Sequence, residues 1–275
     1  MTQRVDAGWS VREFQGIDLG DARLNRRLLT LAEAFGAQPQ APINQASVDW
    51  QDTKAAYAFF ANPHALPAEI LLPHQQRTLE RMAAHPLVLA IQDTTLAVTP
   101  LSLPLGVLDQ QIWARPEPER DTKRTKQRPS ADKESHKWLT ALRETASLTP
   151  AEIRLVTIAD READIFEFLA EADELQAEYV IRAAQDRRVK GEVGLLWAHM
   201  AKQEVVGTVT VEVAARSGKP ARQAELLVRA AHITLQPPQR PVDDAGIWLE
   251  PLQVWALWLH EDAAPEGVEP LDWCC

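Results

Sequence analysis

Apolar positions in the first 84 residues recur every three or four residues, which is the spacing of amphipathic helices. One helix is predicted over residues 18–36, where Asp18 or Asp21 can cap the start and Gly36 with Pro39 ends the pattern. The predicted buried side of this helix consists of Leu24, Leu28, Leu31, Ala32 and Phe35.

Two further helices are predicted over residues 49–61 and 67–84, because Pro63 ends the first pattern and Pro67 suits the first turn of the second. The three helices together predict a small helical domain over residues 1–84. The apolar side of the 49–61 helix is predicted to hold Ala55, Ala56, Phe59 and Phe60.

From residue 87 the pattern changes to short continuous apolar runs, which are typical of buried strands. Such runs occur at 87–91, 153–159 and 179–181, and helical patterns begin at Trp138 and cover 165–175. Strands alternating with helices predict an α/β core with a mixed sheet over residues 85–185. Two shorter runs, 96–98 and 105–113, predict additional strands in this core.

After residue 186 apolar and polar residues alternate one by one, as they do in strands with one open face. Val205, Val209, Val211 and Val213 follow this rule, and similar patterns are found at 227–235 and 252–259. We predict a β-rich insertion over 186–251. Residues 252–275 are predicted to start the next core strands, with a short strand at Leu271–Cys275.

Composition narrows the possible functions. The chain has 275 residues, 45% of them hydrophobic, so it can bury a sizeable core. No apolar run is long enough to span a membrane, no secretory signal is evident, and the two cysteines are adjacent, so a cytoplasmic protein is expected. The net charge of −10 means that any nucleic-acid contact must come from local basic patches.

One basic patch is predicted on the 18–36 helix, where Arg23, Arg26 and Arg27 lie at i, i+3 and i+4, and Lys54 adds an exposed cation on the next helix. Guanidinium forks match phosphate oxygens, so these residues are candidate phosphate contacts. The alternative is an ordinary solvated face. The charged segment 115–137 is interpreted as a solvated loop.

Two aspartates, Asp93 and Asp160, directly follow buried strands. If the strands are neighbours, both carboxylates leave the sheet at one edge and form an oxygen-lined site for Mg²⁺ or Mn²⁺. The alternative for each is a turn or helix cap. No glycine-rich phosphate loop, nucleophile elbow or paired-histidine metal motif is present. The tryptophans at 248, 255 and 258 are expected to pack a β-surface.

Six segments, in the correct order, resemble the bacterial cut-and-paste transposases of the Tn-five / IS-four group. These transposases have an RNase-H-like core and an Asp-Asp-Glu triad. The segments are LGDARLNRRLLTLAEAFG (19–36), DWQDTKAAYAFFANP (49–63), LAIQDTT (89–95), KWL (137–139), IADREADIFEFL (158–169) and YVIRAA (179–184).

The resemblance implies that Asp93 and Asp160 are catalytic acids that bind Mg²⁺ or Mn²⁺. It also implies that the helical domain contacts double-stranded DNA at transposon ends, and that a β-rich insertion follows the second acid. The DNA contacts carried over by the matching segments are Arg23, Arg26, Arg27 and Lys54.

Two departures from the family are evident. The third acid is expected on a helix beyond a P-L-x-W-like segment, but here Pro270–Trp273 is followed by only two residues, so no third catalytic acid and no C-terminal dimer region can be matched. In addition, Thr95 is followed at once by Leu96, where relatives carry a longer passage. We interpret this as an internal deletion that alters the surroundings of Asp93.

Three hypotheses remain open at this point. The first is an inactive, C-terminally truncated transposase. The second is a non-catalytic DNA-binding protein that competes or regulates at element ends. The third is a metal-dependent nuclease that uses Asp93, Asp160 and a substitute acid such as Glu162.

Overall fold

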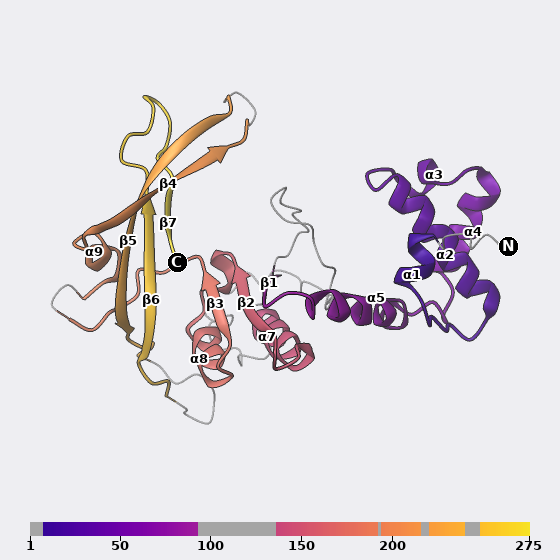
Figure 1. The fold of residues 1–275 in the computed structure, drawn as a ribbon, viewed down its shortest axis with the longest axis horizontal. Helices are drawn as coiled ribbons and strands as arrows, with labels where there is room; N and C mark the ends of the chain where they lie inside the picture. Colours follow the sequence, from indigo (N-terminus) through magenta and orange to yellow (C-terminus); the bar gives the residue numbers. More distant parts are fainter. Residues whose placement is uncertain (1–7, 93–135, 192–193, 216–219, 240–247) are drawn as a thin grey trace, which may run out of the picture. The chain divides into compact units, whose positions relative to one another are not determined.

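The computed structural model describes residues 8–92, 136–191, 194–215, 220–239 and 248–275. The described chain divides into two compact units, a helical unit that ends at Pro86 and a unit that begins at Leu87 (Figure 1). Each unit is described by itself.

The described part of the helical unit, residues 8–86, contains two long helices, one of intermediate length and two short ones. Leu28 and Leu31 of the first long helix pack against Ala56 and Phe59, and Leu19 completes this small core. The helices are α1 (Trp9–Glu13), α2 (Ala22–Ala37), α3 (Ile43–Ala46), α4 (Trp50–Phe60) and α5 (Pro67–Met82).

Helix starts follow the local chemistry of the sequence. The Asp21 carboxylate caps α2 by accepting a bond of 2.7 Å from the Arg23 backbone N–H, and Asp49 caps α4 through the Asp52 backbone N–H at 2.8 Å. One prediction about burial was wrong: Phe60 is 53% exposed. It lies at the last residue of α4, where the helix has turned it away from the core.

The second unit begins with a sheet of parallel strands, in the order β1 (Leu87–Gln92), β2 (Arg154–Ala159) and β3 (Glu178–Ile181). Helices α7 (His136–Leu148) and α8 (Phe166–Glu174) pack against the sheet face that carries Ala159 and Ile181 (Figure 1). The predicted strands at 96–98 and 105–113 lie outside the described residues, as does most of the predicted loop 115–137. The last residues of that loop, His136 and Lys137, belong to α7.

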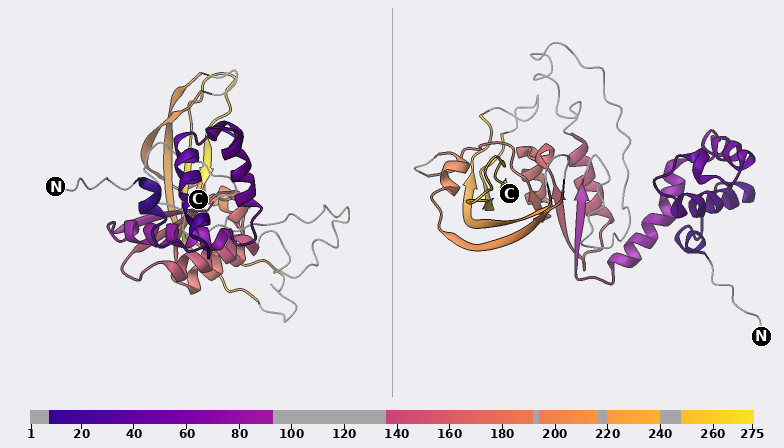
Figure 2. Two further views of the ribbon diagram at one scale, coloured as in Figure 1. Left: turned by 90° about the vertical axis from the view of Figure 1, so that its right-hand side faces the viewer. Right: turned by 90° about the horizontal axis from the view of Figure 1, so that it is seen from above.

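The other sheet is antiparallel, and Figure 2 shows its long strands bending strongly. It has the order β4 (Val205–Val213), β5 (Arg222–Leu235), β6 (Leu252–His260) and β7 (Asp272–Cys274), with the short helix α9 (Leu196–Met200) against it.

Residues 252–275, which are predicted to start the next core strands, contain β6 and β7. β6 pairs with β5 along its whole length, and β7 pairs with β6, so both extend the antiparallel sheet.

A buried carboxylate holds the segment that follows β3. Asp164, next to the start of α8, accepts bonds from the backbone N–H groups of Ala184 and Gln185 at 2.7 and 2.8 Å. It also accepts a bond of 2.9 Å from Nε of Arg187. The Ala183 N–H donates to the Cys274 carbonyl at 2.7 Å, so β7 is held beside the end of β3.

Candidate nucleic-acid interface

Two of the predicted cations project from α2 into solvent. The Arg23 side chain is 85% exposed, and its Nε lies 3.5 Å from the Asp21 carboxylate. Arg26 is also exposed, and its Nε donates to the Ala22 carbonyl one turn earlier at 3.3 Å. Exposed ion pairs of this kind are weak, so both guanidinium groups remain able to bind a stronger anion.

Arg27 occupies a different environment from its two neighbours. Its side chain is 34% exposed and donates to the Asp52 carboxylate of α4 at 3.2 Å. It therefore links α2 to α4, beside the core residue Leu28. The sequence grouped Arg27 with Arg23 and Arg26 because its partner lies 25 residues away and has no local signal.

Lys54 lies on an exposed face of α4, together with two aromatic residues that the sequence reasoning missed. Trp50 is 77% exposed and Tyr57 is 56% exposed, and they lie one turn to either side of Lys54. Lys54 follows Asp52 by two residues, which corresponds to about 200° of rotation around the helix. It therefore lies on a different side of α4 from the contact between Asp52 and Arg27. The sequence did carry a signal for the exposure of these aromatic residues, because the helical spacing of Trp50 and Tyr57 does not place them on the face that carries the buried Ala56 and Phe59.

Of the two aspartates at strand ends, Asp160 lies within the described residues and Asp93 does not. Asp160 is exposed at the carboxyl end of β2, and its Oδ1 accepts a bond of 2.9 Å from the Glu162 N–H. It thereby caps the short 3₁₀ helix η2 (Arg161–Ala163), which is the cap interpretation of this residue. This bond uses one carboxylate oxygen and leaves the other for a further ligand.

Asp93 lies outside the described residues, but the strand that precedes it does not. β1 and β2 are parallel, and their register pairs Gln92 with Ala159, the residues immediately before Asp93 and Asp160. Because the two strands run parallel and in register, both end at the same edge of the sheet, about 4.8 Å apart.

The charges around Asp160 are mixed. Glu162, the candidate substitute acid, forms an ion pair of 3.3 Å with Lys137. The pKa of Arg182 is lowered, first by burial and then by the nearby charge of Arg161, while Asp160 acts in the opposite direction.

Metal ligands are sparse in the part of the chain that the structure describes. No group of three His, Cys, Asp or Glu side chains there could hold a metal ion. Burial raises the pKa of the Cys274 thiol to about 12, so this side chain is a poor thiolate ligand at neutral pH. The exposed carboxylate of Asp160 fits Mg²⁺, which usually takes one or two carboxylates and keeps several waters.

None of the described helices combines the length and the apolar character that a membrane span requires.

Residues 6–65 match the protein-family model for the transposase DNA-binding domain. The match includes α1 to α4, and with them Arg23, Arg26, Arg27 and Lys54, and it ends just before α5. Residues 6–65 thus form a DNA-binding domain of the transposase type.

Proposed function

We propose that the chain binds double-stranded DNA at the ends of a mobile element, and that Arg23, Arg26 and Lys54 make the phosphate contacts. The observation that carries this proposal is the family match over residues 6–65, together with the exposure of these three side chains within it. Phosphate contacts of this kind position a protein on the duplex and make its affinity depend on salt.

Arg27 has a supporting role in this proposal. Its bond to Asp52 holds α2 against α4, so it fixes the helix from which Arg23 and Arg26 project. A contact of Arg27 with DNA would compete with that bond. We therefore assign the larger share of the phosphate binding to the two exposed arginines.

The test is selection of duplexes by the full 275-residue chain from a pool of random sequences. We expect one sequence to be enriched, and we expect that sequence to recur as an inverted repeat flanking the gene. Retention of duplexes without enrichment would reduce the function to general DNA binding. No retention at low salt would overturn the proposal.

For the second unit we propose an RNase-H-like core related to that of the cut-and-paste transposases. The supporting observation is the register of β1 and β2, which brings the strand ends before Asp93 and Asp160 to one edge. These two carboxylates would hold Mg²⁺ or Mn²⁺, which supplies Lewis-acid activation in phosphoryl transfer. The Asp160 side chain would orient the ion while its other oxygen holds the η2 turn.

The 275 residues by themselves are proposed to bind DNA without cutting it, because only two of the three expected carboxylates can be assigned. Loss of one member of a catalytic group commonly costs about 10³-fold or more in rate. A chain with these properties would compete for element ends with a complete enzyme. This proposal corresponds to the hypothesis of a non-catalytic DNA-binding protein at element ends.

The matching experiment incubates the enriched duplex with Mn²⁺ and compares the chain with its Asp93→Asn, Asp160→Asn and Glu162→Gln variants. We expect no strand cleavage by any of the four proteins and retained DNA binding by all of them. Cleavage that disappears in all three variants would show that Glu162 acts as a substitute acid, and would contradict the proposal.

A further inference from the structure

We propose that an open cavity between α1 and α5 binds a backbone phosphate of the DNA, so that α5 extends the interface beyond the matched residues 6–65. This inference rests on the proposed DNA binding. The cavity has a volume of about 500 Å³. Its wall consists of Trp9, Arg12, Glu13, Gln15, Arg77 and Arg81.

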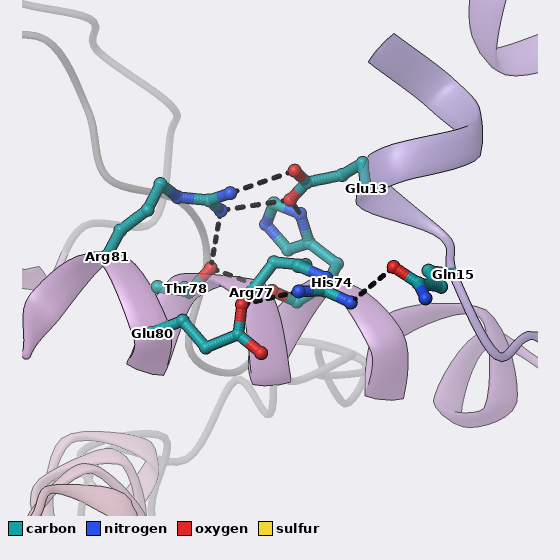
Figure 3. A network of polar contacts seen from close by, with 7 residues as sticks. All are labelled: Glu13, Gln15, His74, Arg77, Thr78, Glu80 and Arg81. Atoms are coloured by element: carbon teal, nitrogen blue, oxygen red, sulfur yellow. Dashed lines mark hydrogen bonds and ion pairs between the residues drawn. The ribbon is translucent and has the colours of Figure 1, made fainter. Parts of the chain in front are cut away.

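The single carboxylate in the wall is already neutralised. Both oxygens of Glu13 accept bonds from Arg81, at 2.8 and 2.9 Å, and Oε1 also lies 2.6 Å from Nδ1 of His74 (Figure 3). Burial acts to raise the pKa of Glu13, but the bonds and charges of Arg81 and His74 outweigh burial and hold that pKa below its ordinary value of 4.5. Glu13 is therefore a poor competitor for an incoming anion.

Arg77 supplies the donors that an anion needs. One of its terminal nitrogens donates to Gln15 Oε1 at 2.8 Å, and the other pairs with Glu80 at 2.5 Å (Figure 3). A guanidinium has five N–H donors, so these two bonds leave capacity for more. The Nε–H is shielded from solvent and has no hydrogen-bond partner among the residues that the structure describes.

An exposed ion pair at the cavity can open to admit an anion. Arg77 pairs with Glu80 beside the wall, and Arg81 pairs with Glu13 in the wall. The Glu80 side chain is 60% exposed, and an exposed pair of this kind is weak, so a phosphate can displace it from Arg77.

An apolar wall beside the arginines favours a phosphodiester over a small hydrated ion. The Trp9 ring lies so close to Gly36 of α2 that a Cβ on Gly36 would lie 2.6 Å from the ring. The ring is still 42% exposed and can pack against the sugar next to a phosphate. α1 is inside the family match, so one wall of the cavity belongs to the matched residues.

The experiment measures affinity of the full chain for a labelled duplex of arbitrary sequence as a function of salt. Arg77→Gln is expected to weaken binding about tenfold near 0.1 M salt and to lower the salt slope by about one unit. Glu80→Gln removes the competing carboxylate and is expected to tighten binding about two- to fivefold. The matched controls are Arg154→Gln and Glu178→Gln, which alter an exposed ion pair in the other unit and should leave the slope unchanged.

The outcomes separate this proposal from the one on which it rests. An unchanged slope in Arg77→Gln, with normal salt-dependent binding by the unmodified chain, would overturn the cavity proposal alone. Absence of binding by the unmodified chain would overturn both. If inorganic phosphate raises the melting temperature of the unmodified chain but not of Arg77→Gln, while the DNA slope stays the same, the site serves free phosphate and the DNA assignment is wrong.

Discussion

Two arginines, Arg23 of the helical unit and Arg187 of the second unit, have opposite surroundings. In the helical unit Arg23 is 85% exposed beside a single weak partner. In the second unit Arg187 is only 12% exposed and is bonded to a carboxylate that is 4% exposed. The first environment leaves charge available to a ligand, whereas the second uses it to hold the fold together.

Net charge follows the same division. Residues 1–86 contain eight Arg and Lys against nine Asp and Glu, a net charge of −1, so the remaining residues carry −9 of the total −10. The unit proposed to meet DNA is therefore nearly neutral, and its exposed cations can act locally. Long-range repulsion of DNA by the acidic remainder is screened over about 8 to 10 Å at ordinary salt.

Removal of the buried carboxylate of the second unit should have a large effect on stability. Asp164→Ala leaves Arg187 buried without its partner and two backbone N–H groups unpaired. We expect a loss of about 3–5 kcal/mol in the free energy of unfolding. Urea unfolding followed by tryptophan fluorescence measures it, with Glu178→Gln as the exposed control. A loss no larger than that of the control would contradict the locking role of Arg187.

The pH dependence of stability reports on a second buried ion pair of this unit. Glu261, 2% exposed, is bonded to Arg222, and this bond is the main reason why its pKa lies below the ordinary 4.5. A folded pKa below the unfolded pKa stabilises the fold above pH 4.5, and this contribution is lost as the pH falls through the folded pKa. Thermal unfolding should show this loss in the unmodified chain and a smaller loss in Arg222→Gln. Equal losses in both proteins would contradict the assignment.

The smallest expected effect separates two neighbouring arginines of α2. Arg27→Gln breaks the bond to Asp52 and should lower the melting temperature of the helical unit slightly. Arg26→Gln should leave the melting temperature unchanged and lower the salt slope of DNA binding by about one unit. On the same samples, circular dichroism measures the melting temperature and binding isotherms measure the salt slope. Identical behaviour of the two variants would show that they share one role.

Elements with a long periodic pattern were predictable from the sequence. The spacing of Leu24, Leu28 and Leu31 predicts α2, and the cap at Asp21 that the pattern allowed is present. α1, α3 and α9, of four or five residues each, are too short to show a period. The pairing of β6 with β5 could not be predicted, because the local sequence of a strand does not identify its partner strand.

The candidate sites were predictable only where chemistry is local. Asp160 follows its strand as expected, and the exposure of Arg23 and Arg26 agrees with their helix positions. The cavity between α1 and α5 could not be anticipated, because Glu13 and Arg81 lie 68 residues apart. Such contacts are created when helices pack, so neither residue carries a signal of the other.

The salt dependence of DNA binding by the full chain carrying Arg23→Gln and Arg26→Gln together tests directly whether these two side chains contact phosphates. We predict a slope lower by about two units, with an unchanged melting temperature. The matched control is Arg143→Gln with Arg154→Gln, which removes the same charge from two exposed arginines of the second unit and should keep the original slope. An unchanged slope in the Arg23 and Arg26 variant would contradict the proposed phosphate contacts.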